Sequence, residues 1–116
     1  MELFVAITDN DWFRYLRSLP AVDEVNFWQP SGERTFRALE PGEFLLFKLH
    51  HPQNYIVGGG FFVRYLSLPY PFVWDAFGPK NGAPTLEEMK RRIERYRRSP
   101  VGSNDPIGCI LADHAA

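Results

Sequence analysis

The alternation of hydrophobic and polar residues predicts a pair of long strands at the centre of the chain. Residues 44–49 form an almost unbroken apolar run, as expected of a strand buried on both faces. A second run at 55–65 is rich in β-branched and aromatic residues, and the polar segment 50–54 reverses the chain between the two. Because the run Gly58–Gly60 weakens a regular strand, we expect the second strand to bend there. The remaining elements must pack around this hairpin.

Shorter segments predict the other elements. Alternating, β-prone stretches predict strands at 2–7, 25–29, 35–39 and 107–112. Apolar residues at helical spacing predict helices at 12–19, 72–77 and 85–98, the last opened by a capping box from Thr85 to Glu88. Two prolines within 66–71 predict a crossing loop. The order predicts an α+β fold: a small, mixed, partly closed β-barrel of five to seven strands with two to three helices.

Length and composition change this picture little. The 116 residues predict a single domain, 1–116, with a net charge of −1. The single cysteine, Cys109, lies in a predicted buried strand and excludes an intramolecular disulfide. We therefore expect the protein to be located in the reducing environment of the cytoplasm. The N-terminus lacks the pattern of a signal peptide, and no stretch approaches the ~18 apolar residues of a membrane span.

Positive charge gathers on the last predicted helix. The segment 80–98 carries seven of the thirteen Lys and Arg residues against three Glu. Arg91, Arg95 and Arg98 face away from the apolar stripe of the helix, where they could meet phosphates. Glu and Arg residues also stand at i,i+4 spacing, which is typical of a solvated helix face. Both interpretations remain open from the charge pattern.

Two aromatic and amide clusters are candidates for a ligand pocket. In the first, Asn26 and Trp28 share one face of a strand, Phe27 and Gln29 share the other, and Ser31 follows in a turn. A flipped base needs ring faces to stack on and amides or hydroxyls for its polar edge. The second cluster extends from Trp74 through Phe77 to Gly82 and could form an opposite wall. For both clusters, filling of the core is the simpler alternative.

The sequence shows no catalytic pattern. His50 and His51 are adjacent and diverge on an extended strand, with no Cys or third His at ligand spacing. Neither a Ser-His-Asp order nor paired carboxylates are evident, and Gly58–Gly60 lacks the Lys-Ser or Lys-Thr of a phosphate loop. We therefore expect no enzymatic activity in this domain, no metal and no cofactor.

A series of stretches resembles the N-terminal region of bacterial HNH-type, modification-dependent restriction endonucleases. The matching stretches are 25–30, 36–39, 41–48, 54–61, 74–78, 81–82 and 88–89. The resemblance covers about residues 3 to 112 and is specific as a series rather than piece by piece. No HNH nuclease motif follows in this sequence. The resemblance therefore implies a reader domain whose nuclease half would lie beyond Ala116.

More distantly, the order of elements around 39–58 is similar to the PUA superfamily, with its ASCH, EVE and YTH branches. Those branches are small barrels that bind RNA or modified bases, and the EVE and YTH branches hold the base in an aromatic-lined pocket. The resemblance implies that the region 26–31 forms one wall of such a pocket here.

Together these observations predict a DNA-binding reader of modified bases that flips a base into an aromatic pocket and targets an HNH nuclease domain. The candidate pocket residues are Asn26, Trp28, Gln29, Ser31, Tyr55, Trp74 and Phe77. The candidate contacts to the DNA backbone are Arg34, Lys80, Asn81, Arg91, Arg95 and Arg98. Two alternatives stay open: an RNA-binding PUA-like or ASCH-like module, and a protein-interaction domain that binds no nucleic acid.

Overall fold

The computed structural model of the chain describes residues 3–20, 22, 24–30 and 39–113. Its elements in chain order are β1 (Leu3–Thr8), α1 (Asn10–Ser18), β2 (Val25–Gln29), β3 (Phe44–Leu49), β4 (Ile56–Pro69), α2 (Tyr70–Phe77), the 3-10 helix η1 (Gly78–Asn81), α3 (Leu86–Arg97) and β5 (Pro106–Asp113). The predicted strand at 35–39 falls almost wholly outside the described residues.

The five strands form one mixed sheet in the order β1-β3-β4-β5-β2. β1 and β3 run parallel, and the other neighbouring pairs are antiparallel. The sheet curves without closing, because β1 and β2 stand at its two edges. The predicted α+β class, with five strands in a partly closed barrel and three α-helices, is confirmed.

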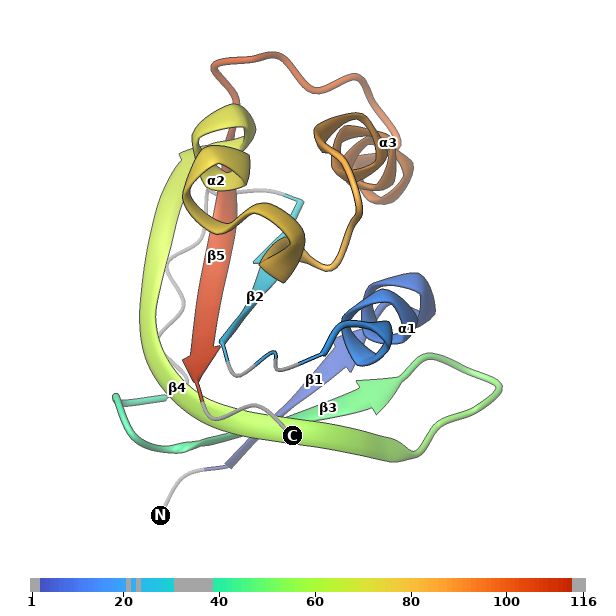
Figure 1. The fold of residues 1–116 in the computed structure, drawn as a ribbon, viewed down its shortest axis with the longest axis vertical. Coiled ribbons are helices and arrows are strands. Elements are labelled where there is room, and N and C mark those ends of the chain that lie inside the picture. The colour runs from blue at the N-terminus through green and yellow to red at the C-terminus, as the bar shows by residue number, and fades with distance from the viewer. Residues whose placement is uncertain (1–2, 21, 23, 31–38, 114–116) are drawn as a thin grey trace.

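The long strand β4 bends because it serves two partners. Its first part pairs with β3 up to Phe61, and its second part pairs with β5 from Phe61 onward. Register shifts interrupt the two ladders, beside Phe47 and between Phe62 and Arg64. A Cβ atom on Gly59 would lie 2.8 Å from the carbonyl oxygen of Leu45, so only glycine fits at this close approach. Figure 1 shows β4 curving around the side of the sheet that carries the helices.

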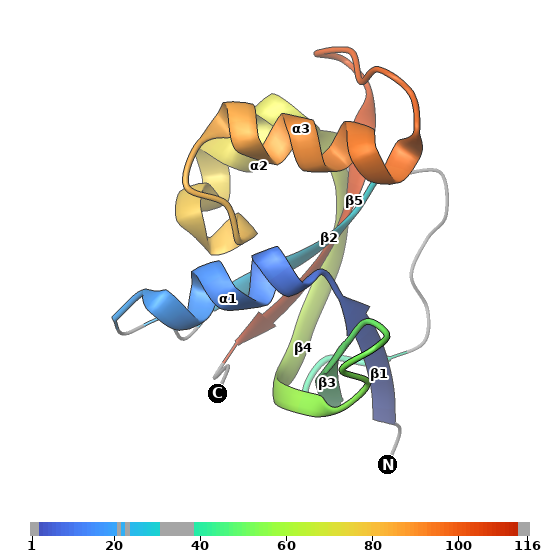
Figure 2. The same ribbon diagram turned by 90° about the vertical axis from the view of Figure 1, so that its right-hand side faces the viewer.

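The helices pack on one side of the sheet over the core. Figure 2 shows α1 and α3 one above the other on that side. Thr85 caps α3 and accepts a hydrogen bond from the Glu88 N–H at 3.1 Å, as the capping box predicts. Below the helix, Met89 and Ile93 are fully buried with Ile110 of β5. In the described part of the chain, no helix has the length and apolar character that a membrane span requires.

The prediction of a crossing loop at 66–71 is wrong. Leu66 to Pro69 continue β4, and Tyr70 begins α2 directly. Pro69 ends the strand and Pro71 lies in the first turn of the helix. Proline has no backbone N–H, and at these two positions its absence costs no hydrogen bond of the sheet or the helix. The prolines mark the junction of strand and helix rather than a loop.

Candidate functional site

The N-terminus of α1 places a carboxylate at the edge of the sheet. Asp9 is the N-cap, and one of its oxygens accepts a hydrogen bond from the Trp12 N–H at 3.2 Å. Because β1 and β3 are parallel, the residues that follow them, Asp9 and His50, come out at the same edge. The Tyr96 side chain of α3 reaches this edge and donates a hydrogen bond to Asp9 at 2.5 Å. Three segments that are distant in sequence thus meet at one point.

The indole of Trp12 is held in place by contacts with β2, β3 and the loop after η1. Its ring meets Phe47 and Phe27 edge-on, with centroid distances of 5.2 and 5.7 Å. Its N–H donates to the carbonyl oxygen of Asn26 in β2 at 3.1 Å. A Cβ atom on Gly82 would lie 2.0 Å from the Trp12 ring, so the loop after η1 closes directly onto the indole. These contacts fix the ring between the two edges of the open sheet.

Beside Trp12 lies a cavity of about 290 Å³, which we call the aromatic cavity. It is lined by Ile7, Asp9, Trp12, Phe27, Trp28, Gln29, Pro30, His50 and Tyr96. The volume is at the lower end of the range of small-molecule sites. Rings and aliphatic groups make up most of the lining, with the carboxylate of Asp9, the amide of Gln29 and the phenol of Tyr96 as polar groups.

A second, more polar hollow adjoins the aromatic cavity, and we call it the arginine cleft. It is lined by Asp9, Asn10, Asp11, Arg14, His50, Arg95, Tyr96 and Arg98. The two hollows share Asp9, His50 and Tyr96. An apolar, ring-lined space therefore lies next to a cleft that carries three arginines, from α1 and the end of α3, together with Asp9 and Asp11.

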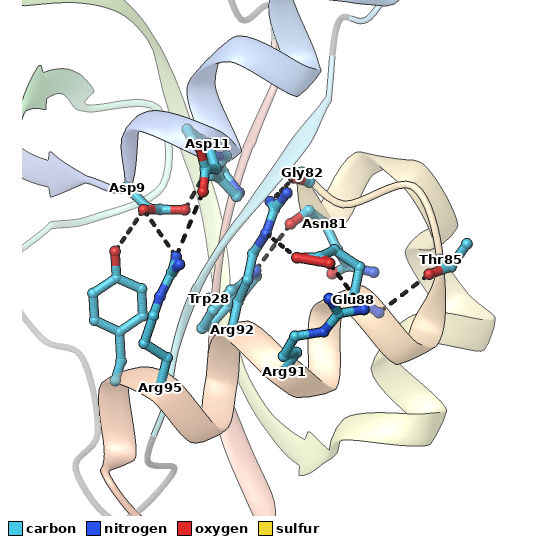
Figure 3. A network of polar contacts seen from close by, with 12 residues as sticks. Asp9, Asp11, Trp28, Asn81, Gly82, Thr85, Glu88, Arg91, Arg92 and Arg95 are labelled. Carbon is cyan, nitrogen blue, oxygen red and sulfur yellow. Dashed lines mark hydrogen bonds and ion pairs between the residues drawn. The ribbon is translucent and has the colours of Figure 1, made fainter.

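Ion pairs and hydrogen bonds connect α1 with α3 across the cleft. Arg95 lies 3.5 Å from Asp9 and 3.7 Å from Asp11, and its side chain is 54% exposed. Figure 3 shows Arg95 pointing from α3 toward both carboxylates. Burial and the hydrogen bond to Asp9 raise the pKa of Tyr96 to about 12. His50 stacks on the Tyr96 ring, with an angle of 13° between the planes.

Comparison with known proteins defines the fold. Neither a family model nor a curated protein matches the chain. Among solved structures, the crystal structure of a single-residue mutant of the ZmASCH protein from Zymomonas mobilis is similar, with a TM-score of 0.55 and 10% sequence identity. The similarity covers 97% of this chain and 68% of that chain. The chain has an ASCH-like fold. This agrees with the distant resemblance to the PUA superfamily.

In this ASCH-like fold, two amides of the predicted clusters, those of Asn26 and Asn81, are part of the structural core. The Asn26 Nδ2 donates to the Asn81 Oδ1 at 2.8 Å, and both residues are 0% exposed. Asn81 in turn donates to the carbonyl oxygens of Val73 and Gly78, and its own carbonyl accepts from the Trp28 indole at 2.9 Å. We call these contacts the amide network. Neither amide has a surface through which a DNA strand could reach it.

The structure separates the predicted pocket residues. Trp28 and Gln29 line the aromatic cavity. Trp74 and Phe77 pack against the core elsewhere and are not part of the cavity wall. Tyr55 is 58% exposed and lines a different, apolar hollow between α1 and the β3–β4 hairpin. Ser31 lies outside the described residues.

The predicted phosphate contacts are also divided. Arg95 and Arg98 line the arginine cleft. Arg91 is 74% exposed, pairs with Glu88 at 3.2 Å and is not part of the cleft lining. Lys80 pairs with Glu24 at 3.6 Å. Arg34 lies outside the described residues.

The sequence patterns did not single out four residues of the site: Asp9, Trp12, His50 and Tyr96. A usable signal was present, since Asp9 and His50 each follow directly after a strand. Polar side chains after parallel strands meet at one edge of a sheet, but the parallel pairing of β1 with β3 was not predicted. Tyr96 shares the helical spacing of the apolar residues Met89 and Ile93, which is typical of a core position, and its phenol reaches the site only through the packing of α3.

Proposed function

We propose that this chain is a DNA-binding reader that takes a modified base out of its stack into the aromatic cavity. One observation carries the proposal: a ring-lined cavity lies beside a cleft that holds three arginines, and the two share Asp9, His50 and Tyr96 in their walls. A base offers two apolar faces and a polar edge, and it is attached to an anionic backbone. The two adjoining hollows match these two parts in size and chemistry.

The aromatic cavity supplies stacking surfaces. Trp12, Phe27, Trp28 and Tyr96 contribute rings to its lining. Stacking of a base on a protein ring is worth about 1–3 kcal/mol by alanine substitution. Trp12 and Trp28 are buried and hydrogen-bonded, so their positions are set before any ligand enters.

The arginine cleft supplies contacts for the backbone. Arg14 projects from α1, and Arg95 and Arg98 project from the end of α3. The ion pairs of Arg95 with Asp9 and Asp11 are long and solvent-exposed. Such pairs contribute little, about 0–1 kcal/mol, so a phosphate can replace them at small cost.

The role in a larger protein rests on the resemblance to HNH-type restriction endonucleases. We propose that the module directs a C-terminal HNH nuclease to modified DNA and itself carries out no chemistry. RNA binding and protein binding without nucleic acid are the competing functions, and they are separate outcomes of the same experiment.

The test is equilibrium binding to duplexes of one sequence that carry cytosine, 5-methylcytosine, 5-hydroxymethylcytosine or a glucosylated base at one position. A matched RNA serves as the comparison for the 2′-hydroxyl. Tighter binding to one modified duplex than to the plain duplex supports the proposal. Equal binding to all duplexes contradicts base reading, preference for the RNA favours an RNA-binding module, and binding to none favours a protein-interaction domain.

A further inference from the structure

We propose that the aromatic cavity selects bases that carry an exocyclic amino group, and that the carboxylate of Asp9 receives the amino hydrogen. This inference rests on the proposed function, because it names the class of base that the cavity takes. It follows from the hydrogen-bond donors and acceptors of the cavity wall that are not already bonded within the protein.

The two indoles of the cavity offer no free donor. The Trp12 N–H is bonded to the carbonyl oxygen of Asn26, and the Trp28 N–H is bonded to the carbonyl oxygen of Asn81. Both bonds are buried, and an indole has no second polar group. These rings therefore contribute stacking surface alone.

Asp9 retains capacity as an acceptor. Its Oδ1 accepts from the Tyr96 hydroxyl and lies 3.5 Å from the Arg95 guanidinium, while its Oδ2 accepts from the Trp12 N–H. An ionised carboxylate has about four lone-pair sites. Among the described residues, these three donors leave one site, on Oδ2. The side chain is 16% exposed and lines the aromatic cavity, so a ligand can approach it.

Tyr96 strengthens the acceptor character of this wall. Its hydroxyl hydrogen points to Asp9, and its oxygen accepts a hydrogen bond from Arg95, which leaves one oxygen lone pair for a ligand. Since its pKa is raised to about 12, the phenol keeps that hydrogen at neutral pH. Gln29 can present either its carbonyl or its amino group, and His50 has a donor and an acceptor nitrogen when neutral. The fixed polar groups of the wall thus favour a ligand that donates.

Bases differ in what they present to such a wall. The N4 amino group of cytosine and the N6 amino group of adenine are donors, whereas thymine has the acceptor O4 at the equivalent place. An acceptor placed against a carboxylate is repelled and leaves a desolvated oxygen unpaired. Phosphate is favoured in the arginine cleft, because Arg14, Arg95 and Arg98 line it and no Lys or Arg lines the aromatic cavity. The geometry therefore favours the base in the aromatic cavity and the phosphate backbone in the arginine cleft.

The cleanest test compares two single strands that differ only in 5-methylcytosine or thymine at one position. The two bases have the same ring size and the same methyl group, so stacking and shape are closely matched. They differ at the polar edge, where 5-methylcytosine has the N4 amino group and an acceptor N3 and thymine has the acceptor O4 and an N3–H. Single strands remove the cost of unpairing. We expect the 5-methylcytosine strand to bind about tenfold more tightly, the lower end of the discrimination seen for a well-placed side chain on a base edge.

Asp9→Asn should abolish this ratio. Asparagine caps helices as well as aspartate does, so α1 is retained, but the amide replaces one acceptor oxygen with a donor. Asp11→Asn is the matched control: it changes the net charge equally and also loses a partner of Arg95, but Asp11 does not line the aromatic cavity. Tyr96→Phe keeps the carboxylate and frees its Oδ1, so this variant should preserve the preference even if Asp9→Asn folds poorly.

The outcomes separate the inference from the proposed function. Binding of both strands with equal affinity by the wild-type chain overturns the amino-group preference alone. Retention of the tenfold ratio in folded Asp9→Asn, or its loss in Asp11→Asn and Tyr96→Phe, overturns the role of Asp9. Absence of binding to either strand overturns the inference together with the proposed function.

Discussion

Trp28 stands between two regions that are built from similar residues and behave differently. On one side, its indole N–H enters the amide network with Asn26 and Asn81. On the other, its ring lines the aromatic cavity with Asp9 and Tyr96. The network is fully buried, whereas the Tyr96 residue at the cavity is 41% exposed.

The difference lies in the solvent access of the polar groups. In the amide network, Asn26 donates to the side-chain oxygen of Asn81, and Asn81 donates to the backbone carbonyl oxygens of Val73 and Gly78, so the network joins η1 to β2. The Asn26 Oδ1 has no partner among the described residues, but Asn26 is 0% exposed and no ligand can reach it. In the aromatic cavity, Asp9 keeps an acceptor site that faces open space. An aromatic and amide pattern therefore indicates a ligand site only where a polar group has both solvent access and unused hydrogen-bonding capacity.

The largest effect is expected from breaking the amide network. Asn81→Ala removes the partner of the Asn26 amide and leaves the buried carbonyl oxygen of Val73 and the partly buried one of Gly78 without this donor. At roughly 1–3 kcal/mol for each orphaned group, we expect a loss of about 3 kcal/mol or more in the free energy of unfolding. Urea denaturation measures it. The exposed Asn104→Ala should change stability by less than about 0.5 kcal/mol, and equal stability of the two variants would contradict the structural role.

A smaller loss of stability is expected where Gly82 packs against the Trp12 ring. Gly82→Ala places a Cβ atom against the Trp12 ring at a φ of 78°, whereas Gly42→Ala has a φ of 91° and meets nothing within 4 Å. Both carry backbone strain, so their difference reports the collision, which should cost a further 1–3 kcal/mol, roughly. Thermal unfolding compares the two. If they melt alike, Trp12 can move aside and the cavity wall is less rigid than its contacts indicate.

For DNA binding, the position of an arginine should matter more than the total number of positive charges. Arg98→Gln removes a cation from the arginine cleft, and Arg91→Gln removes an exposed cation of α3 that does not line the cleft. We expect Arg98→Gln to lower the salt dependence of DNA binding by about one phosphate contact, a change of roughly 0.9 in the slope of log K against log salt. Arg91→Gln should leave the slope unchanged. Equal slopes for the two variants would place the DNA on another surface.

The smallest effect on stability concerns the Tyr96 hydroxyl, which donates a hydrogen bond to Asp9 in the cavity wall. Burial and the bond to Asp9 raise its pKa from 10.0 to about 12, so the fold favours the neutral phenol. This stabilisation is fully present below about pH 10 and is lost as the pH rises through about 12. Melting temperatures between neutral and alkaline pH should fall less steeply for Tyr96→Phe than for the wild type. Tyr55→Phe, at an exposed tyrosine, should leave the alkaline decrease in place.

Several features of this protein follow from local sequence. Thr85 caps α3 through a bond to a residue three positions away, and Met89 and Ile93 recur at helical spacing on its buried face. The apolar run of 44–49 is β3, and Asn26 and Trp28 share one buried face of β2. These interactions span a few residues, so propensity and periodicity are sufficient to predict them.

The tertiary structure alone decided where the site lies. The bond between Tyr96 and Asp9 joins residues 87 positions apart, and His50 reaches the same edge only because β1 pairs parallel with β3. The same packing turned Asn26 and Asn81 toward each other across 55 positions and so enclosed them. Burial and unused hydrogen-bonding capacity are properties of such non-local contacts, and no local pattern of residue types encodes them.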